Sequence, residues 1–166
     1  KVVTRIYTAF EKANDSFPSD KVVKLGNPTR ASVYAAYQKS LATKHEGFGL
    51  TVMGGSQGAH QLNQALVEAL PLLNDIRSQI KIYHQTGTAD YEWVKNCYEE
   101  NSWNVVLSPF IDDMGHVYGQ VDFAITRAGA SSISELITCD TPALLIPYPF
   151  AADDHQRHNA EALVKE

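Results

Sequence analysis

The 166-residue sequence has little cysteine, no cluster of positive charge and no long apolar run. Its two cysteines, Cys97 and Cys139, stand alone without a CxxC pair, which indicates reduced thiols in a cytosolic protein. The formal net charge is −5 with no basic run, which argues against nucleic acid as a partner. A membrane-spanning helix needs a run of about 18 or more apolar residues. The sequence has no such run and no signal peptide, so no membrane span is predicted.

What the sequence does contain is a regular alternation of strand and helix patterns. Apolar, β-branched runs predict strands near 2–8, 21–24, 49–53, 80–85, 104–107, 122–126 and 143–147. Helices are predicted at about 59–70, 89–100, 112–119, 131–139 and from 153 onward, with Pro71 ending or kinking the first of them. Such alternation predicts an α/β fold, a Rossmann-like parallel sheet with helices on both faces. Residues 9–31 are less regular, and a domain boundary is expected between 26 and 45.

The stretch 50–66, LTVMGGSQGAHQLNQAL, runs from a strand through three glycines into a helix. In parallel sheets ligands bind at the carboxyl ends of the strands, where a helix start offers unpaired N–H groups and a positive dipole. Glycines there let phosphate oxygens approach the backbone, and Ser56 adds a hydroxyl. A tight strand-to-helix turn with no ligand would need the same glycines, so both interpretations stand. The stretch lacks the GxGxxG pattern, which makes NAD binding less favoured. It also lacks the GK[ST] pattern, so it is not the loop of a P-loop NTPase.

A second strand–glycine–helix corner follows at 125–136, ITRAGASSISEL. Two such corners on one rim predict a crevice for a ligand with a central diphosphate. Glu135 in this stretch could accept both hydroxyls of a ribose, as the acidic residue of dinucleotide folds does. Ser132 and Glu135 also match the spacing of a capping box, in which Glu135 would only satisfy the start of its own helix.

Three other features imitate functional sites. Asp112 and Asp113 look like a metal-binding acidic pair, but they begin a short helix, where aspartate is a common N-cap. His155 and His158 lie one helical turn apart without an evident third ligand, so zinc is not predicted. Arg127 could contact phosphate or pair with a nearby carboxylate. No metal and no other cofactor is predicted.

Six motifs in order resemble a known family. They are GNPTR (26–30), GGSQGAHQLN (54–63), FIDDM (110–114), RAGASSISEL (127–136), PALLIPYP (142–149) and DDHQRHNA (153–160). Together they resemble the carboxyl-terminal, donor-binding half of the MurG family of bacterial peptidoglycan transferases. The resemblance implies half of a two-domain GT-B fold. It implies transfer of N-acetylglucosamine, with inversion, from UDP-N-acetylglucosamine to the C4 hydroxyl of undecaprenyl-diphospho-N-acetylmuramoyl-pentapeptide (lipid I).

The resemblance also implies a donor-binding role for particular residues. Arg30 matches a donor-binding arginine, and Ser56 with the backbone of Gly55 and Gln57 would hold the diphosphate. Ile111 would pack on uracil and read it through its main chain, while Glu135 would bind the ribose hydroxyls. The remaining implied contacts are those of Ala130, Ser131 and Ser132 with phosphates and ribose, and of Gln156 and Asn159 with the sugar. The family often has Gln-Gln where this sequence has His155-Gln156, and Leu-Thr at Ser131-Ser132.

The resemblance also implies how the functions are divided between two domains. Residues 1–25 would be the end of an amino-terminal domain and its linker, and residues 26–166 a donor-binding domain incomplete at its carboxyl end. The first residue is Lys1 rather than Met, which suggests a piece of a longer protein. The general base, the acceptor site and the membrane-docking surface would belong to the missing domain. The full protein would then be peripheral on the cytoplasmic face of the membrane, and this piece would bind donor without turning it over.

Two other functions are open at this stage. The chain could belong to another lipid-directed UDP-sugar transferase, such as a glycolipid synthase or an Alg13-like subunit. It could also be a non-catalytic module that binds nucleotide sugars. Preference among UDP-sugars would discriminate between these functions.

Overall fold

The computed structural model describes residues 3–10, 17–43, 46–55 and 58–164. Its strands are β1 (Ile6–Thr8), β2 (Val22–Lys24), β3 (Phe48–Met53), β4 (Ile80–Gln85), β5 (Val105–Ser108), β6 (Phe123–Thr126) and β7 (Ala143–Leu145). Its α-helices are α1 (Ala31–Leu41), α2 (His60–Ala69), α3 (Tyr91–Glu100), α4 (Met114–Tyr118), α5 (Ala130–Thr138) and α6 (His155–Val164). A 3₁₀ stretch, Leu70–Gln79, follows α2.

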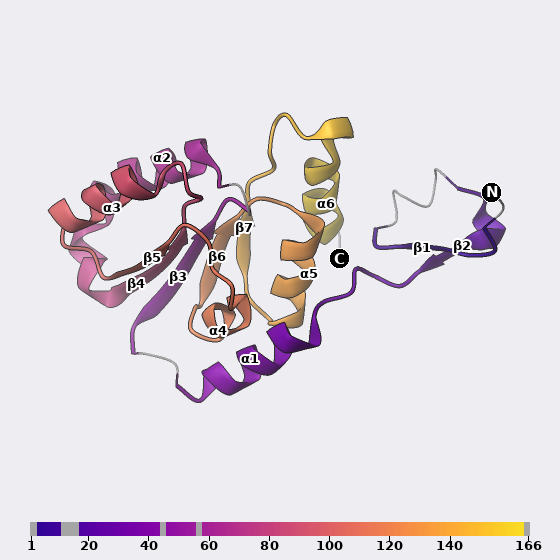
Figure 1. Ribbon diagram of the computed structural model, residues 1–166, viewed down its shortest axis with the longest axis horizontal. Coiled ribbons are helices and arrows are strands. Elements are labelled where there is room, and N and C mark those ends of the chain that lie inside the picture. Colours follow the sequence, from indigo (N-terminus) through magenta and orange to yellow (C-terminus); the bar gives the residue numbers. More distant parts are fainter. Residues whose placement is uncertain (1–2, 11–16, 44–45, 56–57, 165–166) are drawn as a thin grey trace.

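Five of the strands form one parallel sheet in the order β5-β4-β3-β6-β7. Figure 1 shows α2 and α3 on one face of this sheet and α1 with α4 on the other. Alternate residues of β3 separate the two layers: Val52 packs with α2 and α3, whereas Met53 packs with α1 and α4. This period-two division is what a sheet buried on both faces requires. The predicted α/β class with helices on both faces is confirmed.

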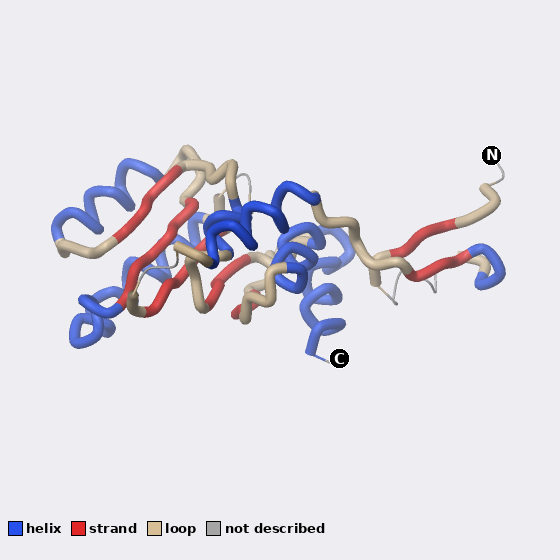
Figure 2. The backbone as a smooth tube through the Cα atoms, turned by 90° about the horizontal axis from the view of Figure 1, so that it is seen from below, coloured by secondary structure: helices blue, strands red, loops and turns tan. Residues whose placement is uncertain are grey.

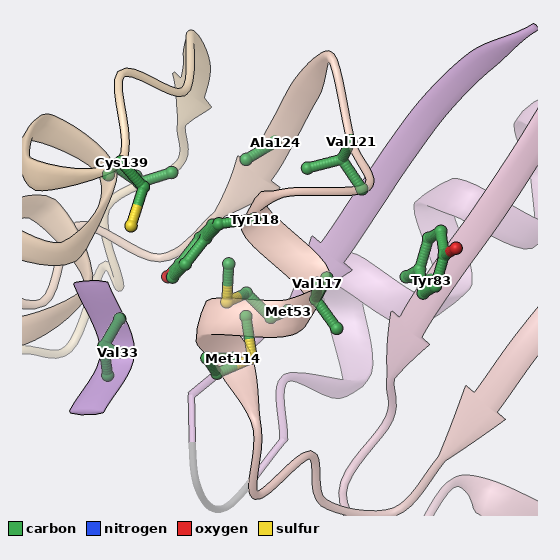
Figure 3. Packing of buried hydrophobic residues seen from close by; sticks show 10 residues of the cluster. Val33, Met53, Tyr83, Met114, Val117, Tyr118, Val121, Ala124 and Cys139 are labelled. Atoms are coloured by element: carbon green, nitrogen blue, oxygen red, sulfur yellow. The ribbon is translucent and has the colours of Figure 1, made fainter. Parts of the chain in front are cut away.

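The core between the sheet and α1, α4 and α5 is drawn in Figure 3. Val33 from α1 and Met114, Val117 and Tyr118 from α4 pack against Met53 of the sheet. The helices α1 and α4 approach so closely that a Cβ at Gly115 would collide with the backbone carbonyl of Val33. Side-chain packing and one close backbone approach at Gly115 therefore both contribute to the contact between these two helices.

Six strands were predicted within two residues of those observed, whereas β1 begins at Ile6, four residues after its predicted start; five helices were found where the sequence placed them. Pro71 lies at the start of the 3₁₀ stretch, as its effect on α2 predicts. Helix α1 was missed. It buries only Val33 and Ser40, so it carries no broad apolar stripe. Its N-cap, Arg30, also lacks the side-chain hydrogen bond that marks a helix start.

The first two strands form a separate two-stranded parallel sheet. Figure 2 shows β1 and β2 at one end of the molecule, joined to α1 by an extended segment that contains Gly26 and Pro28. The described residues include no helix with the length and apolar character that a membrane crossing would require.

Candidate functional site

The two glycine corners lie side by side at the carboxyl edge of the sheet. Strands β3 and β6 are neighbours, with Met53 aligned to Thr126, and the next amide, that of Arg127, donates to the carbonyl of Met53 at 3.3 Å. Helix α2 follows the first glycine corner, residues 54–59, and α5 follows the second, residues 127–130. The expected juxtaposition of two helix N-termini on one rim is therefore present.

Glycine is required at the first corner by backbone geometry. Gly55 and Gly58 have φ angles of +90° and +78°, and the amide of Gly58 donates to the carbonyl of Gly55 at 3.1 Å. A Cβ at Gly58 would collide with the carbonyl oxygen of Thr86, at the end of β4. The corner thus packs backbone against backbone, which only glycine permits. Ser56 and Gln57, both predicted to hold a diphosphate, lie outside the described residues.

A cavity of about 680 Å³ opens at this corner. Its described lining comes from both corners, from the start of α2 and from the segment leading into α6. The lining residues are Gly54, Gly55, Gly58, Ala59, His60, Gln61, Arg127, Tyr148, Phe150 and Gln156. None of them is acidic, whereas Arg127 is cationic and His60 can become so. Neither α2 nor α5 has a side-chain cap on its first turn, so this edge of the sheet favours anions.

Arg127 is the most unusual residue of the cavity. It is only 8% exposed, and one guanidinium nitrogen donates to the carbonyls of Ile146 and Pro147 at 3.3 and 3.1 Å. Its Nε is buried and has no hydrogen-bond partner among the described residues, and the guanidinium lies over the Tyr148 ring, 5.5 Å from the centroid. The alternative that it pairs with a carboxylate is wrong within the described residues. Burial lowers its pKa, and Tyr148 offsets part of that effect. A buried cation without a counter-ion is costly, which makes this position suited to a bound anion.

Glu135 does not cap its helix. Helix α5 begins at Ala130 with Gly129 as N-cap, so Ser132 lies inside the helix and the capping-box interpretation is wrong. One carboxylate oxygen of Glu135 accepts from Arg30 at 3.5 Å, and the other accepts from the buried Tyr118 hydroxyl at 3.3 Å. Burial and the nearby Glu135 raise the pKa of Tyr118, so the phenol remains a donor. The structure thereby brings together Arg30 and Glu135, which lie 105 residues apart in sequence.

Ile111 is held in place by Gln85, a residue that the sequence did not single out. The Gln85 side chain accepts from the Ile111 amide and donates to the Gly55 carbonyl, both at 2.9 Å. It therefore ties the loop that precedes α4 to the first glycine corner. Because the Ile111 N–H is engaged, a ligand that reads it must displace Gln85. Gln85 is the last residue of β4 and pairs in register with Met53 of β3. Its position at the carboxyl end of a strand is the sequence feature that could have marked it as a site residue.

The predicted residues of α5 and α6 occupy different positions. Ala130, Ser131 and Ser132 form the first turn of α5. Gln156 lines the cavity and its carbonyl oxygen accepts from the Tyr148 amide at 2.9 Å, which leaves its NH₂ group for other partners. Asn159 is buried and donates to the Ala128 carbonyl at 3.1 Å. It ties α6 to the second corner and does not line the cavity.

A polar network lies under the start of α2. It consists of His60, Asn63, His84, Asp90, Trp93 and Tyr98. The Asn63 amide donates to Asp90 at 2.7 Å and to the Thr86 carbonyl at 2.9 Å, so its oxygen is the group that faces His84 Nε2 at 3.0 Å. That oxygen can only accept, which makes neutral His84 the Nε2–H tautomer, with Nδ1 accepting from the Tyr98 hydroxyl. Burial lowers the pKa of His84 to about 4, against a smaller opposing effect of Asp90.

The residues that resemble metal ligands in the sequence have other contacts in the structure. Asp113 caps α4 by accepting from the His116 amide at 3.0 Å, as predicted. His158 faces Glu161 at 3.7 Å along α6. Across the described ranges, no three His, Cys, Asp or Glu side chains are grouped closely enough to hold a metal ion.

A family model described as the glycosyltransferase family 28 C-terminal domain matches residues 49–166. The chain belongs to this family. The matched region contains both glycine corners and the whole cavity lining. Arg30, which pairs with Glu135, and helix α1 both precede the matched region.

Two similar curated proteins carry the same name. The UDP-N-acetylglucosamine–N-acetylmuramyl-(pentapeptide) pyrophosphoryl-undecaprenol N-acetylglucosamine transferase of Desulfotalea psychrophila is 44% identical over 166 residues, with 99% of this chain and 45% of the relative covered. The transferase of the same name from Geotalea daltonii is 40% identical, with 100% and 46% covered. The crystal structure of Acinetobacter baumannii MurG matches with a TM-score of 0.71 and 32% identity, over 99% of this chain and 45% of that one. The chain thus spans somewhat less than half the length of these relatives.

Proposed function

We propose that this chain binds UDP-N-acetylglucosamine in the cavity between the glycine corners, as the donor half of an inverting N-acetylglucosaminyltransferase. The acceptor would be the C4 hydroxyl of undecaprenyl-diphospho-N-acetylmuramoyl-pentapeptide. The observation that carries the proposal is the charge of the cavity: its described lining has no acidic residue, yet it holds the buried, uncompensated Arg127. The family match and the names of the relatives supply the identity of the donor and acceptor.

The diphosphate would lie against the first glycine corner and Arg127. Gly55, Ser56 and Gln57 would then surround the phosphates, with the first turn of α5, Ala130 to Ser132, on the other side. The uncapped starts of α2 and α5 would direct backbone N–H groups at the ligand. Two uncapped helix starts and one guanidinium give a site complementary to two negative phosphates.

The remaining donor contacts follow from the neighbouring side chains. Glu135 would accept the ribose hydroxyls, with Arg30 beside it and Tyr118 holding the other carboxylate oxygen. Ile111 would pack on uracil, where Gln85 now occupies its amide. Gln156 would offer its NH₂ group to the sugar, and Asn159 is proposed for the same subsite.

The chemistry would be displacement at the anomeric carbon with UDP leaving. Negative charge grows on the departing phosphate oxygen, and fixed donors aimed at that oxygen lower the barrier. Arg127 and the two helix starts would supply this stabilisation without a metal ion. No residue of this chain is proposed as the general base.

The rest of the reaction would depend on sequence outside this chain. We propose that residues 1–25 lead from an amino-terminal domain and that 26–166 form the donor domain. The acceptor site and the membrane-contacting surface would belong to that other domain, which would make the full protein peripheral on the cytoplasmic face of the membrane.

Calorimetric titration of this chain with UDP-N-acetylglucosamine, UDP-glucose and UDP-galactose tests the proposal. We expect UDP-N-acetylglucosamine to bind at least tenfold more tightly than the other two, on the order of 1.4 kcal/mol. Equal affinities would favour a different UDP-sugar transferase or a non-catalytic module. Absence of binding by any UDP-sugar would refute the proposed function.

A further inference from the structure

His60 is the second basic side chain, besides Arg127, that lines the cavity. It is the first residue of α2, its side chain is 67% exposed, and it lines the cavity together with Arg127. Its imidazole contacts the edge of Trp93 with ring centroids 5.8 Å apart. The ring is thus held in place by its neighbours while much of it stays open to solvent.

The orientation of the ring is fixed by Asp90. His60 Nδ1 lies 2.9 Å from Asp90 Oδ1, and a carboxylate can only accept, so Nδ1 carries a proton. In neutral imidazole the other nitrogen, Nε2, is then an acceptor, which repels a phosphate oxygen. In the imidazolium Nε2 is a donor, which attracts one.

The hydrogen bonds to Asp90 favour its ionised form. Its two oxygens receive hydrogen bonds from Trp93 Nε1, His60 Nδ1 and Asn63 Nδ2, between 2.7 and 2.9 Å. Burial opposes ionisation, but these three donors together hold the pKa of Asp90 below its usual value. The Asp90 carboxylate therefore remains an acceptor for His60 Nδ1–H.

The other titratable groups near His60 lie in the cavity and in the polar network. Arg127 and Tyr148 line the same cavity, and His84 lies behind Asn63 in the polar network. A diphosphate bound in this cavity would bring negative charge to both His60 and Arg127, which line it together.

We propose that His60 is a protonation-linked ligand of the diphosphate. Nε2 takes one proton from solvent as the nucleotide sugar binds and then donates a hydrogen bond to a phosphate oxygen, while Nδ1–H stays on Asp90. This inference rests on the proposed function, which puts the diphosphate in this cavity.

Calorimetry in buffers with different ionisation enthalpies measures the proton uptake. UDP-N-acetylglucosamine is the suitable probe, because both of its phosphates are esterified on two sides and neither titrates near neutral pH. Titrations from about pH 6 to about pH 9 cover the range in which histidine changes charge. We expect uptake that approaches one proton above neutrality, with the Kd rising about tenfold or more across this range.

His60→Gln keeps a donor for Asp90 but does not titrate, and His60 is exposed enough for the fold to tolerate it. It should abolish the uptake and flatten the pH dependence of the Kd. His158→Gln removes a histidine outside the cavity and should behave like the unmodified chain. The same proton uptake in the unmodified chain and in His60→Gln would overturn the inference. Absence of nucleotide-sugar binding in the unmodified chain would instead refute the proposed function.

Discussion

Replacing Gly58 by alanine tests how closely the first glycine corner is packed. Its φ of +78° costs an L-residue about 1–2 kcal/mol. The new Cβ would also collide with the Thr86 carbonyl oxygen and lie 3.0 Å from the Cα of Gly87. Both are backbone atoms, and the Thr86 carbonyl also accepts from Asn63, so relief would disturb the polar network under α2. Overpacking of this kind adds about 1–3 kcal/mol. We therefore expect Gly58→Ala to lower the free energy of unfolding by about 3 kcal/mol.

Gly55→Ala is the matched control. Gly55 also has a positive φ, +90°, but its Cβ would meet no atom within 4 Å among the described residues. Only the backbone cost of about 1–2 kcal/mol remains. Urea unfolding followed by fluorescence suits this comparison, because Trp93 and Trp103 both belong to the core on that side of the sheet. Equal losses for the two variants would refute the argument that the corner is packed against β4.

Three further predictions concern the site and its supports. Glu135→Ala should weaken UDP-N-acetylglucosamine binding by about 1–3 kcal/mol in calorimetry, through the loss of charge-assisted hydrogen bonds to ribose, and unchanged affinity would remove Glu135 from the site. Asp113→Ala should cost about 1 kcal/mol in urea unfolding by uncapping α4, whereas Asp112→Ala should cost under about 0.5; equal costs would contradict the cap. Because the folded-state pKa of His84 is about 4, below its unfolded value, its contribution to stability is lost as the pH falls. The loss should be about 2 kcal/mol between about pH 7 and pH 5, and an NMR titration of His84 near its ordinary pKa would contradict it.

Much of the fold could be predicted because its signals are local. The strand run LTVM (50–53) and the leucines Leu62 and Leu66 of α2 are buried, and each shows its apolar pattern within a single segment. The glycine corners were visible for the same reason, since a positive φ or a close backbone contact leaves glycine in the sequence. Helix α1 was not visible, because it buries only Val33 and Ser40 and therefore lacks a repeating apolar pattern.

The site was predictable only in outline. Sequence pattern marked both corners as phosphate-binding candidates, and family resemblance added roles for Arg30, Ile111 and Glu135. It could not show that Gln85 bridges Gly55 and Ile111, because those contacts span about 26 to 30 residues. Nor could it decide whether Glu135 caps its helix or pairs with Arg30 and Tyr118. The cap would need Ser132 as the N-cap, three residues after the observed N-cap, Gly129.

Apart from α1, the sequence by itself determined which segments become strands and helices and where glycine interrupts them, because those choices depend on neighbours along the chain. Only the tertiary structure decided that Arg127 is buried with no counter-ion in the described part of the chain, and that His60 lines the same cavity against Asp90. Charge compensation depends on distance through space, and the in-register pairing of β3 with β6 and β4 sets those distances.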